Sequence, residues 1–220
     1  SERVFNFGAP GLDCLQHLHW MDRDALEKSL EILLNSPTFL VTYHPATLGQ
    51  LEPVAAMNEL LAAFDEFPDA TAIFTYPNAD TGGRALIERL DQWVAANKRR
   101  AKAFVSLGQQ RYLSLMREAD VIIGNSSSGL TEGPALKKAT VNIGDRQKGR
   151  LKASSIVDAA ENKNAIVAAI NKVLSVDFRA GLPTTKSLYG CGDVSRRVKD
   201  TLKVVEIRTQ KSFFDIEHAH

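Results

Sequence analysis

The sequence is short of cysteine, of long apolar runs and of charge of one sign. Cys14 and Cys191 are its only thiols, and neither belongs to a CxxC motif or to a Cys/His pair at metal-ligand spacing, so no disulfide framework or metal site is expected. A net charge of +1 creates no broad positive field for nucleic acid or anionic membrane. No apolar stretch approaches the roughly 20 residues that span a bilayer. We therefore expect a cytoplasmic protein that binds neither nucleic acid nor membrane.

Short apolar runs alternate with longer amphipathic segments, which is typical of a parallel sheet covered by helices on both faces. The predicted strands are residues 39–43, 70–75, 103–105, 121–123 and 140–143. Apolar positions three and four residues apart predict helices over residues 22–34, 51–64, 82–98, 109–118, 129–137, 162–174 and 194–205. The predicted fold class is therefore α/β, with a Rossmann-like, doubly wound parallel sheet.

Two segments are less regular. Residues 4–8 are compatible with a strand, and residues 9–13 with a turn that leads into a helix. Residues 178–193 are rich in turn formers. The sheet is expected to stop before the last two helices.

Small and polar residues gather where a predicted strand meets the next helix, and the run GNSSSGLTEG at residues 124–133 is the most informative of these junctions. In a doubly wound fold, ligands bind outside the carboxyl ends of the strands. Small residues let a ligand approach the backbone, and free amides at a helix start favour an anion such as diphosphate. A structural interpretation stays open, in which one serine caps the helix and Glu132 completes a capping box.

Other junctions offer further polar groups. His44 ends a strand, where an imidazole can bind phosphate or move a proton. Asn78 follows the next strand, within a composition that also suits a plain turn. Arg146 and Arg150 follow the last predicted strand, where guanidinium groups suit diphosphate, although a solvated basic loop has the same pattern.

No convincing pair of carboxylates is found for acid/base chemistry. Breaking a sugar C–H bond requires an acid/base set in one pocket. Asp80, Glu132 and Asp145 lie on separate junctions. The chemistry is therefore expected to need residues outside this sequence.

Six motifs follow one another in the order expected of a known family: GAPGLD at 8–13, VTYHP at 41–45, YPNAD at 76–80, IIGNSSSG at 122–129, NIGDRQKGR at 142–150 and YGCGD at 189–193. With them, nearly the whole chain resembles the UDP-N-acetylglucosamine 2-epimerases. The non-hydrolysing branch usually has a His-Arg pair in place of His44-Pro45 and an Asp-Ser-Gly-Gly run in place of residues 125–129. The resemblance is therefore to the hydrolysing branch.

The resemblance implies a GT-B architecture, in which two Rossmann-like domains face each other across a cleft. This chain is similar to the C-terminal, UDP-holding domain. Residues 1–20 would lead in from an N-terminal domain outside this sequence, residues 21–190 would form the UDP-binding domain, and residues 191–220 would pack back toward the partner domain.

The resemblance also implies roles for single residues. It assigns His44 to the diphosphate and the reacting sugar, as the catalytic residue of this chain. It assigns to UDP binding Asn78, Ser106, Leu107, Ser127, Ser128, Gly129, Glu132, Arg146 and Arg150. The backbone of Ser106 and Leu107 would meet the uracil, and Glu132 would hold the ribose. Gly133 stands where some relatives have a second glutamate, which leaves the ribose contact open.

The implied reaction eliminates UDP from a UDP-amino sugar to give a glycal, to which water adds. The product is a 2-epimeric free sugar of the N-acetylmannosamine type, used to make sialic or related nonulosonic acids. No metal or redox cofactor is implied, and the acid/base carboxylates of the family lie in its N-terminal domain. Homodimers occur in the family.

Three alternatives stay open on the sequence. A GT-B glycosyltransferase would share the fold and the phosphate junction but would keep the configuration at the sugar C2. A non-hydrolysing epimerase would share most motifs. A nucleotide-sugar sensor would bind UDP without turnover.

Overall fold

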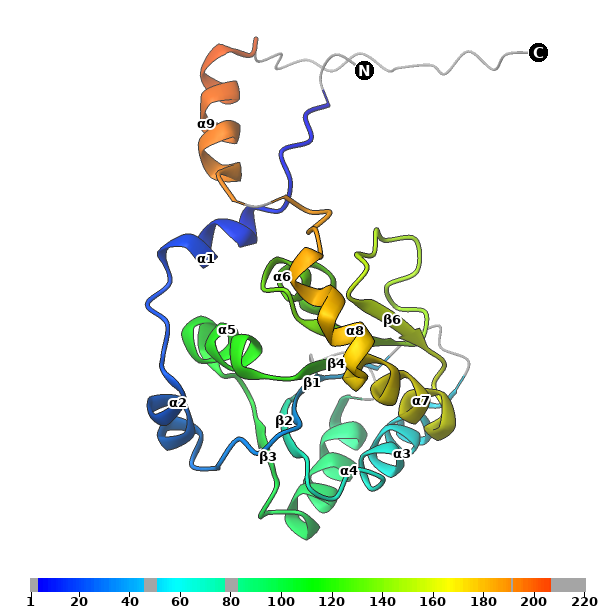
Figure 1. Ribbon diagram of the computed structural model, residues 1–220. Coiled ribbons are helices and arrows are strands. Elements are labelled where there is room, and N and C mark those ends of the chain that lie inside the picture. Colours follow the sequence, from blue (N-terminus) through cyan, green and yellow to red (C-terminus); the bar gives the residue numbers. More distant parts are fainter. Residues whose placement is uncertain (1–3, 46–50, 78–82, 191, 207–220) are drawn as a thin grey trace, which may run out of the picture.

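The computed structural model describes residues 4–45, 51–77, 83–190 and 192–206. Within these ranges one six-stranded parallel sheet has the order β3-β2-β1-β4-β5-β6 (Figure 1). Its strands are β1 (Thr38–Thr42), β2 (Thr71–Thr75), β3 (Ala101–Phe104), β4 (Val121–Gly124), β5 (Ala139–Ile143) and β6 (Ile156–Ala159). The chain adds strands outward from β1 in one direction and then, from β4, in the other. This order is the Rossmann arrangement, and its switch point lies between β1 and β4.

Helices cover both faces of the sheet, as the predicted fold class requires. One face packs against α3 (Pro53–Phe64), α4 (Gly83–Ala96) and α7 (Lys163–Leu174). The other packs against α2 (Arg23–Leu30), α5 (Gly108–Glu118) and α6 (Ser128–Ala135). Both faces of the central strands are buried, which explains their continuous apolar sequence. None of the helices in the described ranges is long and apolar enough to cross a membrane.

Aromatic side chains fill the core under α3 and α4. The rings of Phe39, Phe64, Phe74 and Trp93 contact one another with centroids 5.6 to 6.2 Å apart. The first three are fully or almost fully buried. Buried rings in tilted and edge contacts bring both large apolar area and favourable quadrupole geometry, so this cluster holds β1 and β2 against the helices.

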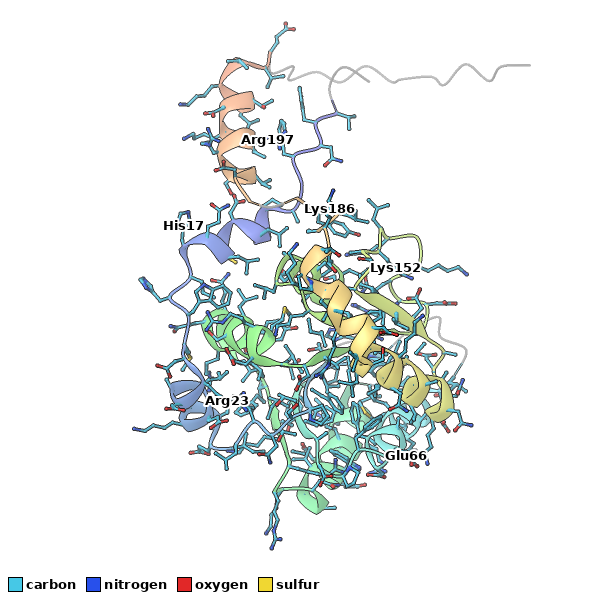
Figure 2. All side chains as sticks on the ribbon, viewed as in Figure 1. His17, Arg23, Glu66, Lys152, Lys186 and Arg197 are labelled. Carbon is cyan, nitrogen blue, oxygen red and sulfur yellow. The ribbon has the colours of Figure 1, made fainter. Side chains whose placement is uncertain are left out.

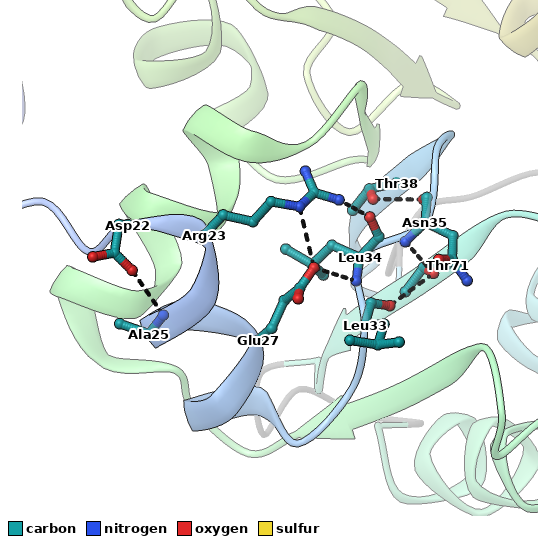
Figure 3. Close-up of polar contacts among 9 residues, drawn as sticks. All are labelled: Asp22, Arg23, Ala25, Glu27, Leu33, Leu34, Asn35, Thr38 and Thr71. Carbon is teal, nitrogen blue, oxygen red and sulfur yellow. Dashed lines mark hydrogen bonds and ion pairs between the residues drawn. The ribbon is translucent and has the colours of Figure 1, made fainter.

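A polar network ties α2 to the start of β1 (Figure 3). The Glu27 carboxylate accepts hydrogen bonds from Arg23 Nε at 3.1 Å and from Leu34 N at 2.9 Å, while the Arg23 guanidinium also donates to the Leu34 carbonyl. Farther along, the Thr71 hydroxyl accepts from Asn35 N at 3.0 Å. Several backbone groups of the non-helical segment after α2 are therefore paired, which fixes its path to β1.

The first described residues and the last helix lie side by side, away from the sheet (Figures 1 and 2). The Asp13 carboxylate caps α9 (Val194–Val204), because it accepts hydrogen bonds from Val194 N at 2.9 Å and from Ser195 N at 2.7 Å. The Ser195 side chain, together with these two backbone bonds, holds the pKa of Asp13 below its usual value. The Arg197 guanidinium lies 4.7 Å from the centre of the Phe7 ring. The two ends of the described chain thus form one small unit.

The elements predicted from sequence occur at the predicted places, with four differences. The short edge strand β6 was not predicted, because only one of its residues is buried and its alternation is weak. Residues 4–9 form no strand; the turn after them is a 3-10 helix, η1 (Pro10–Asp13), followed by α1 (Cys14–His17). The turn-rich segment begins with α8 (Val176–Gly181) and a single 3-10 turn, η2 (Leu182–Thr184). In addition α2 ends early, at Leu30.

Gly124 is the position where the sheet tolerates no side chain. Its φ is +132°, and a Cβ built there would overlap the carbonyl oxygen of Thr42 on the neighbouring strand. Glycine alone adopts this backbone conformation without strain. The close approach of β1 and β4 at their carboxyl ends therefore depends on this residue.

We expect Gly124→Ala to lower the free energy of unfolding by about 2 kcal/mol or more, because strain and overlap with backbone add together. Urea unfolding measures the change. Gly181→Ala is the matched control, since a Cβ there meets nothing within 4 Å and alanine suits a helix better than glycine. Equal stability of Gly124→Ala and the native chain would contradict the close approach.

Candidate functional site

The strongest constraint at the switch point joins the ends of β1 and β4. The Asn125 side chain accepts a hydrogen bond from His44 N at 2.8 Å and donates one to the His44 carbonyl at 2.9 Å. Asn125 N also donates to the Thr42 carbonyl at 3.1 Å. Asn125 is 1% exposed and His44 7%. The backbone of His44 is therefore fixed relative to β4, and only a small part of its side chain is accessible.

The loop after β5 is fastened to the same asparagine. The Asn125 carbonyl accepts hydrogen bonds from Gln147 Nε2 at 2.7 Å and from Arg146 Nη1 at 3.1 Å. Gln147 is buried, whereas Arg146 is exposed. Asn125 thus connects the carboxyl ends of three strands, and it brings the predicted residues His44 and Arg146 into one place.

The start of α6 presents unused hydrogen-bond donors. Among the described residues, the amides of Ser126 and Ser127 and the Ser127 hydroxyl donate to no partner. The helix dipole adds a partial positive charge at this end. Backbone donors at a helix start are a favourable place for phosphate, and Ser126 and Ser127 are both partly exposed.

The three serines have different surroundings. Ser127 is the N-cap residue by position, yet its side chain makes no capping bond within the described chain. Ser126 Oγ accepts from Ser128 N at 3.4 Å and lies 3.0 Å from Ser128 Oγ. The structural interpretation, in which one serine caps the helix, therefore fits Ser126 best and leaves the Ser127 hydroxyl for a ligand.

Glycines let α6 lie directly on the sheet. A Cβ on Gly129 would come within 2.8 Å of Thr140 Cγ2, and one on Gly133 within 2.9 Å of Ile122 Cδ1. The predicted role of Gly129 in close approach to a ligand is thus accompanied by a packing role. The same contact gives a physical reason for glycine at position 133, where some relatives have glutamate.

Glu132 lies one turn into α6, partly buried, next to the 3-10 turn η1. Its carboxylate accepts a hydrogen bond from the Thr131 hydroxyl, so it does not form the alternative capping box. A Cβ on Gly11 would lie 3.6 Å from Glu132 Oε1. Burial, with a smaller contribution from the charge of Glu132, raises the pKa of the Cys14 thiol. The residues before the sheet therefore border the predicted ribose contact.

The remaining predicted residues lie on the same edge of the sheet but apart from this group. Ser106 and Leu107 follow β3, two strands from β1, which corresponds to roughly 10 Å. Ser106 is exposed and its hydroxyl accepts from Gly108 N at 3.1 Å, while the Leu107 side chain is buried. Arg150 is exposed on the loop after β5. Asn78 lies outside the described residues.

The carboxylates described on this edge of the sheet each contact a different residue. Asp145 is exposed and lies 4.0 Å from Lys148. Glu161 accepts a hydrogen bond from the Tyr43 hydroxyl at 2.6 Å, and burial raises the pKa of that tyrosine. Among the described residues, no three His, Cys, Asp or Glu side chains are placed to hold a metal ion.

Three residues of this region were not singled out by the sequence. Asn125 was noted only as part of a run, Gln147 only within a motif, and Tyr112 only inside a predicted helix. Their partners lie 16 to 81 residues away in the chain. The one available signal was an asparagine close after an apolar run. A polar side chain at such a position is expected to be buried and therefore to need a hydrogen-bond partner.

The strand order and the open helix start at the switch point define a Rossmann-like domain of the class that binds nucleotides. The family model described as UDP-N-acetylglucosamine 2-epimerase matches residues 1–203. The chain belongs to this family.

Two curated relatives and one solved structure extend this finding. The GDP/UDP-N,N'-diacetylbacillosamine 2-epimerase (hydrolyzing) of Campylobacter jejuni is 38% identical over 98% of this chain and 56% of its own length. The polysialic acid biosynthesis protein P7 of Escherichia coli is 36% identical over 97% of this chain and 55% of its own. The chain thus spans about half the length of these curated relatives.

The solved structure is the Methanocaldococcus jannaschii UDP-GlcNAc 2-epimerase in complex with UDP-GlcNAc and UDP. It matches 92% of this chain and 55% of its own, with a TM-score of 0.68 and 19% identity. This likeness confirms the predicted fold, in which the chain corresponds to about half of a two-domain GT-B structure.

We expect Asn125→Ala to lower the free energy of unfolding by roughly 2 to 4 kcal/mol, since two buried backbone groups of His44 lose their partners. Hydrogen exchange should show faster exchange of the His44 amide, while amides of β1 that pair within the sheet, such as that of Val41, stay protected.

Asn97→Ala is the matched control for this experiment. Asn97 also makes two side-chain hydrogen bonds, to Trp93 O and from Arg100 Nε, but at the far end of α4. It should leave the exchange of the His44 amide unchanged. An unchanged His44 amide in Asn125→Ala would show that the asparagine does not fix this backbone.

Proposed function

We propose that this chain is the UDP-binding half of a hydrolysing 2-epimerase that converts a UDP-N-acetylglucosamine-type sugar to UDP and the 2-epimeric free sugar. The observation that carries the proposal is the pairing of His44 with Asn125 beside the open start of α6. A histidine and unused amide donors at one switch point support a site that binds a diphosphate ester together with its reacting sugar.

The names of the relatives support the hydrolysing reaction. The Campylobacter relative is named a hydrolyzing 2-epimerase of a diacetylated sugar nucleotide, and the Escherichia coli relative a protein of polysialic acid biosynthesis. Both similarities extend over nearly all of this chain. A product of the N-acetylmannosamine type, used for sialic or related nonulosonic acids, agrees with both names.

The proposed contribution of this chain to the reaction is to bind the leaving group. As the C1–O bond breaks and the C2 proton leaves, negative charge develops on the UDP oxygens. The amides at the start of α6, the Ser127 hydroxyl and the Arg146 guanidinium supply donors for that charge. Ser128 and Gly129 shape the same turn, and Glu132 binds the ribose hydroxyls. Arg150 supports the diphosphate from the neighbouring loop.

The uracil is proposed to lie over the backbone of Ser106 and Leu107, at the carboxyl end of β3. Asn78 would line the nucleotide pocket between these two regions. The order of strands supports this placement, because β3 and β4 lie at opposite ends of the row β3-β2-β1-β4. A nucleotide that runs along this row would reach from the uracil contact to the phosphate contact.

The division into residues 1–20, 21–190 and 191–220 is part of the proposal. On α9, Val194, Val198 and Leu202 share one face and are 1%, 37% and 59% exposed. The η1 turn lies against the start of the helix, and more than half of the last of these side chains is exposed. An apolar stripe that leaves its own domain in this way supports contact with a partner N-terminal domain, which would supply the catalytic carboxylates.

Calorimetric titration should show that this chain binds UDP and not AMP. Glu132→Ala should weaken UDP binding roughly tenfold or more, since hydrogen bonds to a carboxylate are lost, with little change in thermal unfolding without ligand. Glu88→Ala, an exposed glutamate on α4, is the matched control and should bind UDP like the native chain. Absence of UDP binding would remove the nucleotide site from this chain.

This chain alone should release no UDP from UDP-N-acetylglucosamine, because the acid/base carboxylates are proposed to lie in the partner domain. A coupled assay for UDP measures the release, with a heat-denatured sample as the blank. Sustained turnover would show that a catalytic pair lies within these residues.

The glycosyltransferase alternative is not favoured, because the family model and the relatives are epimerases. Product analysis on the complete protein separates the remaining alternatives. A free sugar inverted at C2 supports hydrolysing epimerisation, a UDP-linked epimer the non-hydrolysing reaction, and UDP binding without turnover a sensor.

A further inference from the structure

A row of hydroxyl groups runs beneath the start of α6. Thr75 Oγ1 lies 2.6 Å from Thr42 Oγ1, at the ends of β2 and β1. The Tyr112 hydroxyl, from α5, lies 2.6 Å from Ser128 Oγ and close to the Thr42 side chain. Ser128 Oγ is in turn 3.0 Å from Ser126 Oγ. The row therefore joins three secondary-structure elements to the serine turn.

Tyr112 is the link in the middle of this row. Each hydroxyl has one hydrogen to donate and can also accept, so neighbouring groups in a row align their hydrogens in one direction. Burial raises the pKa of Tyr112 above its usual value, and its phenol therefore keeps the hydrogen that the row requires. Without this phenol, the two threonines and the two serines are no longer connected.

One contact at the serine end of the row has a defined donor. Ser126 Oγ already accepts a hydrogen bond from Ser128 N. If Ser128 also donates to Ser126, the hydrogen of Ser126 is left for a group outside the protein. Hydrogen bonds in such a row polarise one another, so the last donor is strengthened. A polarised hydroxyl donor forms its strongest hydrogen bond with an anionic acceptor, such as a phosphate oxygen.

We propose that Tyr112 is a positioning residue for diphosphate, acting through Ser128 so that the Ser126 hydroxyl donates to a phosphate oxygen. This inference rests on the proposed UDP site and adds to it a residue that does not touch the ligand. It also changes the expected role of Ser128. In this proposal the Ser128 hydroxyl links Tyr112 to Ser126, and Ser126 and Ser127 contact the phosphate.

Tyr112→Phe tests the inference, because it removes one oxygen atom and keeps the ring that packs between α5 and the sheet. The dissociation constants of UDP, UMP and uridine are measured for the native chain and the variant. We expect affinity for UDP and UMP to fall by about tenfold, and affinity for uridine to change by less than about twofold, because uridine has no phosphate.

A double-mutant cycle identifies the route of the effect. Ser128→Ala should weaken UDP binding, and Tyr112→Phe should add little in that background, since residues that act in one network are not additive. In the Ser127→Ala background, Tyr112→Phe should keep its full effect, because the Ser127 hydroxyl has no partner in the row.

Tyr43→Phe is the matched control. Its hydroxyl is also buried and hydrogen-bonded, but to Glu161, and its ring belongs to the core on the opposite face of the sheet. It should lower the melting temperature and leave the affinity for UDP within about twofold. A similar loss of UDP affinity in both variants would mean that general loosening of the fold is the cause.

Three further results overturn the inference. Unchanged UDP affinity in Tyr112→Phe, with UDP binding by the native chain, refutes it while the proposed function stands. An equal loss of affinity for uridine and UDP shows a structural role only. If the native chain binds no UDP, the proposed site fails, and the inference fails with it.

Discussion

The structure depends on the close approach of β1 and β4 at their carboxyl ends. Gly124 permits the contact because no side chain fits against the Thr42 carbonyl, and Asn125 then closes it through two hydrogen bonds with the backbone of His44. A parallel sheet has no hairpin turns to fix adjacent strand ends. Here a glycine and a buried side-chain amide fix the ends of β1 and β4. These are the strands between which the strand order reverses, and a ligand site is expected there.

Much of the candidate site is built outward from that contact. The Asn125 carbonyl holds Gln147 and Arg146, so the loop after β5 is drawn toward the same place. The glycines of α6 let its first turn lie on β4 and β5, which aims the free serine amides beyond the sheet edge. The strand ends are held by hydrogen bonds, while donors at the start of α6 stay unused. Such preorganised donors suit a phosphate site, because they lose little freedom on binding.

Sequence patterns predicted the central strands well, because both of their faces are buried and their apolar runs are continuous. Edge strand β6 was not predicted, because Asp158 interrupts a short and half-covered segment. Helix α2 ends at Leu30, before the predicted end, because Glu31 adopts a left-handed conformation with φ of 53°. Periodicity reports burial, so it is weakest where burial is partial or where one residue changes the direction of the chain.

The sequence by itself determined the α/β class, the family resemblance and the junctions where polar residues collect, because these follow from local composition and order. Only the tertiary structure decided which of those residues meet. His44 and Asn125 are 81 residues apart, and Tyr112 reaches the serine turn from another helix. Hydrogen bonds require contact within about 3 Å, and a linear pattern carries no information on distances between segments that only the sheet order brings together.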